Sequence, residues 1–291
     1  METVYDRIEA DEKSEGGESV QMLFSCPKCG GELIENGASA KCPTGHSFDK
    51  SKHGYYNLLL SNKGGCHGDN KEMVSARRAH LGAGYYEPLA DRIAALALEY
   101  TPPHGAVLDV GCGDGYYTEK VEKALSARDG EANIAAFDIS KDAARELKKR
   151  CPSAFCAVAS AYSVPVRDGA FSTVINAFSP FAREEVLRAL CDGGIFIMAI
   201  PEAEHLFELK KILYKTPYKN ELKNSAIEGF ELLFDQRLSF KMELRSADAV
   251  LNLFRMTPYA YRTPRESAER LFALDMLEVG ADFHLYVYRK V

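Results

Sequence analysis

The chain has 291 residues, of which 46% are hydrophobic and 27% are charged, and its formal net charge is −6 at pH 7. This length predicts about two domains, and the composition is that of a globular protein. The acidic balance argues against a protein that coats nucleic acid indiscriminately, although it allows a local basic surface.

The first 22 residues are rich in Asp and Glu and contain no apolar run. They predict an acidic, disordered tail and neither a signal peptide nor an anchor. No apolar run elsewhere in the sequence reaches membrane-spanning length, so we expect a cytoplasmic protein with no membrane partner. In that compartment the eight cysteines are expected to be metal ligands and buried thiols instead of disulfides.

Residues 23–61 carry four metal-binding side chains in two pairs, Cys26 with Cys29 and Cys42 with His46. Three thiolates and an imidazole can close a tetrahedron around Zn2+, which makes a structural site without an open position. Turn-forming Pro, Gly and Thr residues flank both pairs. A module of this size has too small a core to fold alone, so the metal would supply folding free energy. The alternative is four unrelated buried residues.

Five lysines shift the predicted zinc domain and its neighbourhood toward positive charge within an acidic chain: Lys28, Lys41, Lys50, Lys52 and Lys63. Such a surface suits RNA phosphates, with scattered, solvated lysines as the alternative. Residues 61–70 are rich in glycine and polar side chains and predict a flexible linker. Cys66 and His67 lie in this linker, but the four upstream residues already complete a zinc site without them. Between residues 72 and 100 the apolar spacing predicts two helices that meet at a bend near 82–88. We assign 62–100 to this linker and its helices.

From residue 101 to 291 short apolar runs alternate with amphipathic stretches. The expected strands are 107–110, 134–139, 155–159, 171–178 and 195–200, and the expected helices are 117–125, 141–150, 182–190 and 205–213. Strands that are apolar throughout predict an α/β fold with a mostly parallel sheet covered on both faces. Residues 230–244 and 282–288 predict longer strands on either side of a helix at 247–254. We interpret these strands as an antiparallel pair at one sheet edge.

The predicted strand at 107–110 ends in three alternating glycines, Gly111, Gly113 and Gly115. Glycine lets a ligand approach the backbone closely, so such a turn also fits a dinucleotide site. Two details favour a different ligand. The spacing is Gly-x-Gly-x-Gly instead of Gly-x-Gly-x-x-Gly. Asp109 lies in the strand, where a carboxylate is better suited to orient backbone or a cationic amino group than to meet a pyrophosphate. Asp138 ends the next predicted strand, where it can accept hydrogen bonds from both hydroxyls of a ribose.

Together these features resemble the S-adenosylmethionine site of class I (Rossmann-like) methyltransferases, and a nicotinamide or flavin enzyme is the alternative. In such enzymes the segment after the third strand cradles the adenine, which places Ser160 near the cofactor. The fourth strand ends beside the transferable methyl group. Asn176 and Phe181, in a segment loosely similar to Asn-Pro-Pro-Tyr loops, are therefore candidate catalytic residues, with a strand end and a turn as the alternative.

Further motifs accompany the zinc ligands and this core, at residues 48–49, 54–59, 68–69, 72–73, 76–78 and 84–89. The series resembles the RlmA family of ribosomal RNA (guanine-N1)-methyltransferases over nearly everything after residue 22. The resemblance implies a small N-terminal zinc-binding domain on a class I methyltransferase core. It also implies a homodimer that acts on a hairpin of large-subunit (23S) ribosomal RNA. It assigns structural Zn2+ to the two ligand pairs, and S-adenosylmethionine to Tyr86, Gly111, Cys112, Gly113, Gly115, Tyr116, Tyr117 and His205.

We therefore expect an enzyme that methylates guanine N1. Because N1 lies on the pairing edge, the base must come from a loop or be extruded. Tyr86, Phe178 and Phe181 are candidate stacking partners, with core packing as the alternative for each. Two other functions fit the sequence: methylation of a small metabolite, and RNA binding without catalysis. Methyl uptake that depends on RNA and falls with salt would argue against a small metabolite. A Gly113→Arg variant, which blocks the cofactor but not RNA binding, tests whether catalysis is needed.

Overall fold

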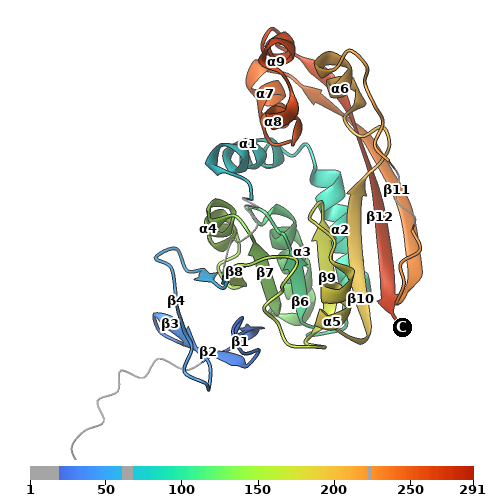
Figure 1. The fold of residues 1–291 in the computed structure, drawn as a ribbon. Coiled ribbons are helices and arrows are strands. Elements are labelled where there is room, and N and C mark those ends of the chain that lie inside the picture. The colour runs from blue at the N-terminus through green and yellow to red at the C-terminus, as the bar shows by residue number, and fades with distance from the viewer. Residues whose placement is uncertain (1–19, 61–67, 222–224) are drawn as a thin grey trace, which may run out of the picture.

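The computed structural model describes residues 20–60, 68–221 and 225–291, and Figure 1 shows their arrangement. A four-stranded antiparallel sheet lies at the N-terminal end, in the order β1 (Val20–Ser25), β2 (Glu32–Asn36), β3 (Ser39–Lys41) and β4 (Ser47–Asp49). β1 begins inside the segment 1–22 that was expected to be disordered. It is held there because it pairs with β2 and buries Met22. The rest of the expected tail, and Cys66 and His67, lie outside the described residues.

The second sheet has eight strands in the order β11-β12-β10-β9-β6-β7-β8-β5. The strands are β5 (Tyr56–Asn57), β6 (Val107–Val110), β7 (Ile134–Asp138), β8 (Phe155–Val158), β9 (Phe171–Ala177), β10 (Leu190–Pro201), β11 (Phe230–Leu244) and β12 (Leu277–Lys290). All neighbours from β5 to β10 are parallel, whereas β12 lies antiparallel between β10 and β11. The predicted parallel sheet with an antiparallel pair at one edge is confirmed.

The helices include α1 (Lys71–Gly82), α2 (Glu87–Tyr100), α3 (Tyr116–Asp129), α4 (Lys141–Arg150), α5 (Arg183–Ala189), α6 (Phe207–Leu213), α7 (Ala247–Arg255), α8 (Tyr259–Arg262) and α9 (Arg265–Phe272). The predicted bend between α1 and α2 is confirmed. Gly84 makes it possible because its φ of 82° lies in the left-handed region that side chains with a Cβ avoid. Sequence reasoning did not predict α8 and α9, which are short and lie beside prolines. Within the described residues, no helix combines the length and apolar character that crossing a bilayer requires.

Both faces of the large sheet are covered, as predicted, but by different elements. α2, α3 and α4 contribute to a core cluster that also contains Val107 and Ile134. On the other face α5 is joined by the zinc domain, because Met22 and Phe24 on β1 belong to the same buried cluster as Leu108 and Phe137. The connection 159–170 between β8 and β9 contains no helix. β1 lies against this connection instead, and the Ser25 amide donates a hydrogen bond to the Pro165 carbonyl at 2.7 Å.

The strand order changes direction at β6. β7 and β8 extend the sheet on one side of it, while β9 and β10 extend it on the other. At such a reversal the loops after the two central strands diverge, which opens a crevice at the carboxyl ends of the strands. The fold therefore places a ligand cleft beside the loops that follow β6, β7 and β9.

Candidate active site and metal centre

A cleft of about 740 Å³ lies at the carboxyl ends of β6, β7 and β9 and is closed on its far side by α1 and α8. This volume falls within the range of roughly 300–1,000 Å³ that is usual for small-molecule sites. Predicted cofactor residues that line it are Tyr86, Asp109, Gly111, Cys112, Gly113, Tyr117, Asp138, Ser160 and His205. The cleft therefore brings together residues from segments that are far apart in the sequence.

The three glycines of the loop after β6 have positive φ angles but different surroundings. A Cβ on Gly111 would lie 2.3 Å from Ser179 Cβ, and one on Gly115 would lie 2.7 Å from Leu147 Cδ1. These two positions need glycine because neighbouring segments pack against the backbone. A Cβ on Gly113 would meet only Arg77 Nη1, at 3.7 Å. Gly113 is therefore the glycine whose bare backbone faces the open cleft.

Two aspartates stand at the strand ends on either side of this loop. Asp109 is 2% exposed, and its Oδ2 accepts the Thr118 hydroxyl hydrogen at 2.6 Å. Burial raises the pKa of Asp109 to about 7, although the hydrogen bond from Thr118 opposes that rise. Asp138 accepts backbone hydrogen bonds from Gly113 (3.0 Å) and Ser140 (2.8 Å), one on each carboxylate oxygen. Each carboxylate is thus fixed in orientation and keeps lone pairs for a ligand.

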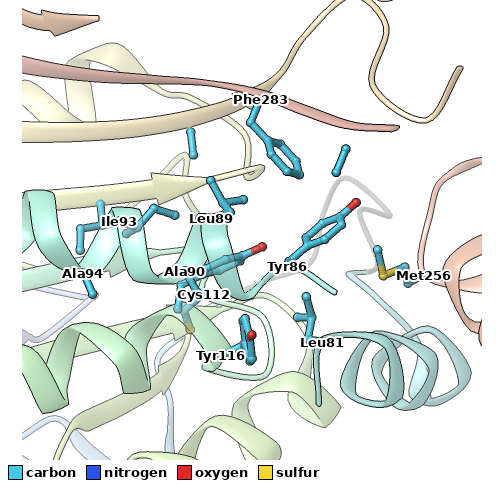
Figure 2. Packing of buried hydrophobic residues seen from close by; sticks show 14 of the residues in the cluster. Leu81, Tyr86, Leu89, Ala90, Ile93, Ala94, Cys112, Tyr116, Met256 and Phe283 are labelled. Atoms are coloured by element: carbon cyan, nitrogen blue, oxygen red, sulfur yellow. The ribbon is translucent and has the colours of Figure 1, made fainter. Parts of the chain in front are cut away.

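Tyr86 and His205 meet on the side of the cleft formed by the α1–α2 bend and the start of α6. The Asp282 backbone amide donates to His205 Nδ1 at 3.2 Å, which assigns the ring hydrogen to Nε2. Nε2 lies 3.3 Å from the Tyr86 hydroxyl oxygen. Burial lowers the pKa of His205 to about 3, so the ring is neutral at physiological pH. With its oxygen accepting from Nε2, Tyr86 turns its own hydroxyl hydrogen to another partner. Figure 2 shows the Tyr86 ring beside Phe283 and Leu81.

Sequence reasoning assigned no role to Asp69 and Arg77, which also line the cleft. Arg77 on α1 forms an ion pair with Asp69, and its Nη2 donates to the Met256 carbonyl at 3.2 Å. Both residues lie in the sequence motifs at 68–69 and 76–78. The motifs alone did not show that the two side chains meet in the cleft. Asp69 and Asp114 also line the cleft, but each is paired with an arginine, Asp69 with Arg77 and Asp114 with Arg150. Among the described residues the two strand-end aspartates form no ion pair, which suits a cationic ligand.

Four predicted site residues do not line the cleft. Gly115 packs under the loop, and the Tyr116 ring lies 5.6 Å from the Arg150 guanidinium carbon on the far side of it. Asn176 is 2% exposed and donates its amide to the Pro180 carbonyl at 3.1 Å. Phe181 stacks on Phe196 at a centroid distance of 5.2 Å. For Asn176 and Phe181 the contacts are those of a strand end and a packed turn. Phe178, which is 40% exposed, is the aromatic of this segment that reaches the cleft.

The metal-binding side chains predicted from the sequence converge between β1 and β4. One ligand atom from each of Cys26, Cys29, Cys42 and His46 lies within 4.8 Å of the others. The Sγ atoms of Cys29 and Cys42 are 3.7 Å apart, and His46 Nδ1 lies 3.4 Å from the Sγ atom of Cys42. Zinc bonds of about 2.3 Å to sulfur and 2.1 Å to nitrogen, at tetrahedral angles, give about 3.8 and 3.6 Å for these edges. The ligand set therefore fits Zn2+ bound through His46 Nδ1.

Comparison with known proteins agrees with this geometry. Residues 24–63 match the family described as RlmA, N-terminal, a zinc ribbon, and residues 107–194 match a methyltransferase domain. The chain is 30% identical to the 23S rRNA (guanine(748)-N(1))-methyltransferase of Streptomyces fradiae over 264 residues, which are 88% of this chain and 92% of that protein. The chain belongs to the RlmA family.

Two further RlmA relatives carry provisional names as 23S rRNA (guanine-N1)-methyltransferases. YxjB of Bacillus subtilis is 30% identical, with 92% of this chain and 97% of that protein covered. A Micromonospora griseorubida protein is 31% identical, with 91% and 97% covered. With an RlmA zinc ribbon and a methyltransferase domain, the cofactors of this chain are structural zinc and S-adenosylmethionine. The predicted class I core with an N-terminal zinc domain is confirmed.

Proposed function

We propose that this protein transfers the methyl group of S-adenosylmethionine to N1 of a guanine in a hairpin of large-subunit ribosomal RNA. The observation that carries the proposal is the joint presence of the zinc cluster and the cofactor cleft in one chain. Relatives that are similar over most of their length are named for this reaction. S-adenosylmethionine, when bound, supplies a methyl group already activated on a sulfonium, so the protein must chiefly position the two reactants.

We assign the cofactor contacts to the residues that the cleft exposes. Asp138 lies at the end of β7, where it can accept from the ribose hydroxyls, and Ser160 lies after β8 on the adenine side. Asp109 can accept from the ammonium group of the methionine moiety. Arg77 and the hydroxyl of Tyr86 are donors that suit its carboxylate. Gly113 leaves the backbone bare between these groups.

The residue that follows β9 supports access of a base to the methyl group. Phe178 has a φ of 64°, which a bulky side chain adopts only at the expense of backbone strain. Such strain is concentrated at functional sites, where it fixes a side chain in a particular direction. The Phe178 ring lies 5.4 Å from Phe283 and 6.1 Å from Tyr117, and it lines the cleft. We therefore propose that Phe178 contacts the target guanine.

The basic surface of the zinc domain supports RNA as the substrate. Lys28, Lys41 and Lys52 are exposed, whereas Lys50 forms an ion pair with Glu35. Exposed lysines on a domain anchored beside the cleft suit the phosphates of a folded RNA. A homodimeric state and a cytoplasmic location stay predictions. Light scattering after gel filtration tests the oligomeric state.

Reverse transcription tests the proposed reaction. Unmodified 23S rRNA transcript is incubated with protein and S-adenosylmethionine, and a methyl group on N1 halts the polymerase because it blocks base pairing. We expect one new stop at a guanine of a hairpin. The Gly113→Arg variant should give no stop because its side chain fills the cofactor space. Gly130→Arg is the matched control, because Gly130 also has a positive φ and has no atom near its Cβ position. The absence of any stop with active, cofactor-binding protein would refute the proposal.

A further inference from the structure

Lys210 on α6 is completely buried. Its side chain is 0% exposed, and within the described residues no carboxylate lies at ion-pair distance from its Nζ. Nζ donates instead to the Tyr218 carbonyl at 3.2 Å and to Asn220 Oδ1 at 2.6 Å. Burying an ammonium group without a counter-ion is unfavourable. Burial accordingly lowers the pKa of Lys210. The two acceptors and the neighbouring aromatic rings replace the water that its ammonium group loses.

Lys210 contacts Tyr218 more closely than any other aromatic residue, because the centroid of the Tyr259 ring lies farther from Nζ, at 5.7 Å. Nζ lies 4.5 Å from the centroid of the Tyr218 ring, so the lysine contacts both the ring face and the backbone of the same residue. Asn220 extends the attachment, because its amide donates to the Glu202 carbonyl at 2.7 Å. The Tyr214 ring packs near the Tyr218 ring, with a centroid distance of 5.6 Å. These contacts fix the position of a tyrosine that lies outside any helix or strand.

The Tyr218 side chain fixed in this way is 49% exposed and lines the cleft that contains Gly113 and Phe178. Tyr162 and Tyr261 are also exposed and line or flank the cleft, but Tyr218 is the one whose ring Lys210 contacts from behind. A cation behind one face of the ring draws π density toward that face, which suits the other face to an electron-rich base. Arg262, which lines the same cleft, is suited to a phosphate next to such a base.

We propose that the free face of Tyr218 is the platform on which the target nucleobase of the RNA stacks, and that Lys210 is the positioning residue that holds this platform. The inference rests on the proposed function and adds the substrate side of the site to it. Stacking on an aromatic ring does not distinguish bases by their hydrogen-bonding groups. Tyr218 would therefore contribute affinity for the extruded base, and other contacts would select guanine.

Steady-state kinetics with the unmodified 23S rRNA transcript tests the platform. Tyr218→Ala should raise KM for RNA about 10-fold or more, since stacking is worth roughly 1–3 kcal/mol per base, and leave the dissociation constant of S-adenosylhomocysteine unchanged. Tyr218→Phe keeps the ring and should retain the KM of the wild type. If wild-type protein produces the stop in reverse transcription while Tyr218→Ala keeps its KM, the platform is refuted and the proposed function stands. If the wild type produces no stop, the proposed function itself fails.

A double-mutant cycle tests the role of Lys210. Lys210→Met keeps a chain of similar length and removes the charge, and it should raise KM for RNA. In the Tyr218→Ala background the same change should add nothing, because Lys210 acts through the ring. Independent, additive effects of the two substitutions on KM would show that Lys210 does not act through the Tyr218 ring and would overturn its assignment.

Fluorescence gives a direct readout of stacking, because the chain contains no tryptophan. Tyr218→Trp introduces one indole at the platform, and Leu232→Trp is the control. Leu232 is exposed on β11, where it pairs with Tyr288 near the end of the sheet opposite the cleft. A hairpin that carries the mapped guanine should quench the indole of the platform variant and leave the emission of the control variant unchanged. The same hairpin with an abasic site at that guanine should quench neither. Equal quenching of the platform variant by both hairpins would overturn the proposal.

Discussion

Tyr86 and His205, 119 residues apart in the chain, meet through a hydrogen bond of 3.3 Å between the phenolic oxygen and Nε2. Because the Asp282 amide fixes the tautomer of His205, the imidazole donates and Tyr86 must direct its hydrogen elsewhere. The pair therefore fixes Tyr86 as a hydrogen-bond donor at the edge of the cofactor cleft. Burial raises the pKa of Tyr86 well above its usual value, so the donor persists at any physiological pH.

Tyr86→Phe should weaken binding of S-adenosylhomocysteine about 10-fold, because a hydrogen bond to a charged group contributes roughly 1.5 kcal/mol. Isothermal titration calorimetry measures the change. Tyr85→Phe is the matched control, because the Tyr85 ring stacks on His80 at 4.7 Å and does not line the cleft. An unchanged dissociation constant for Tyr86→Phe would show that its hydroxyl donates to protein or solvent instead.

Arg77→Leu should weaken cofactor binding by about 10-fold or more, since it removes a cation that can pair with the cofactor carboxylate. The neighbouring Arg78→Leu should leave binding unchanged, because Arg78 pairs with Glu146 outside the cleft. Calorimetry on both variants separates a ligand contact from a general loss of positive charge. Equal losses in the two variants would contradict the assignment.

His80 should make the protein less stable in mild acid. It is 1% exposed, neither ring nitrogen has a partner in the described structure, and burial lowers its pKa to about 3. The folded state thus binds no proton on His80 near neutrality, whereas the unfolded state takes one up below about pH 6.5. Its contribution is complete above pH 6.5 and decreases as the pH falls toward 3. Between pH 7.5 and 5.5 the loss is about 1.4 kcal/mol.

Urea unfolding of wild type and His80→Phe at these two pH values isolates this contribution. Other groups titrate in the same range, Asp109 among them, and their effects cancel when the two proteins are compared. The variant should lose about 1.4 kcal/mol less than the wild type on acidification. Identical losses in both proteins would mean that His80 is solvated or paired in the native state.

Cys29→Ser should remove the metal and lower the free energy of unfolding of the whole chain by roughly 4 kcal/mol or more. The effect extends beyond the zinc domain because Met22 and Phe24 pack in one cluster with Leu108 and Phe137 of the large sheet. Metal analysis and calorimetric melting measure both consequences, and Cys191→Ser, which is outside the metal cluster, should change neither. Two separate melting transitions in the variant would contradict the shared core.

Local patterns in the sequence were sufficient for the elements that stabilise themselves or bind a ligand through neighbouring residues. The alternating glycines and Asp138 placed the cofactor loop, because a backbone that must approach a ligand can use few residue types. The paired spacing of Cys26, Cys29, Cys42 and His46 predicted the metal centre for a similar reason, since two short turns suffice to bring the ligands together.

Local patterns failed where a segment's role depends on what packs against it. Phe178 and Phe181 are three residues apart and chemically identical, yet one lines the cleft and the other stacks on Phe196. Helical spacing places Lys210, but not the exposed Lys211, on the same face as Leu206 and Leu213, yet the sequence does not show what its ammonium group would contact there. Its burial beneath Tyr218 follows from the path of the chain after α6.

The sequence by itself determined the α/β core, the cofactor loop and the zinc ligands, because periodicity, glycine spacing and ligand spacing are properties of short segments. Only the tertiary structure decided that β1 of the zinc domain covers the face beside β7 and β8. It also brought Tyr86 to His205 and Lys210 beneath Tyr218. These contacts join residues whose partners are chosen by the packing of whole elements, and no local pattern encodes that choice.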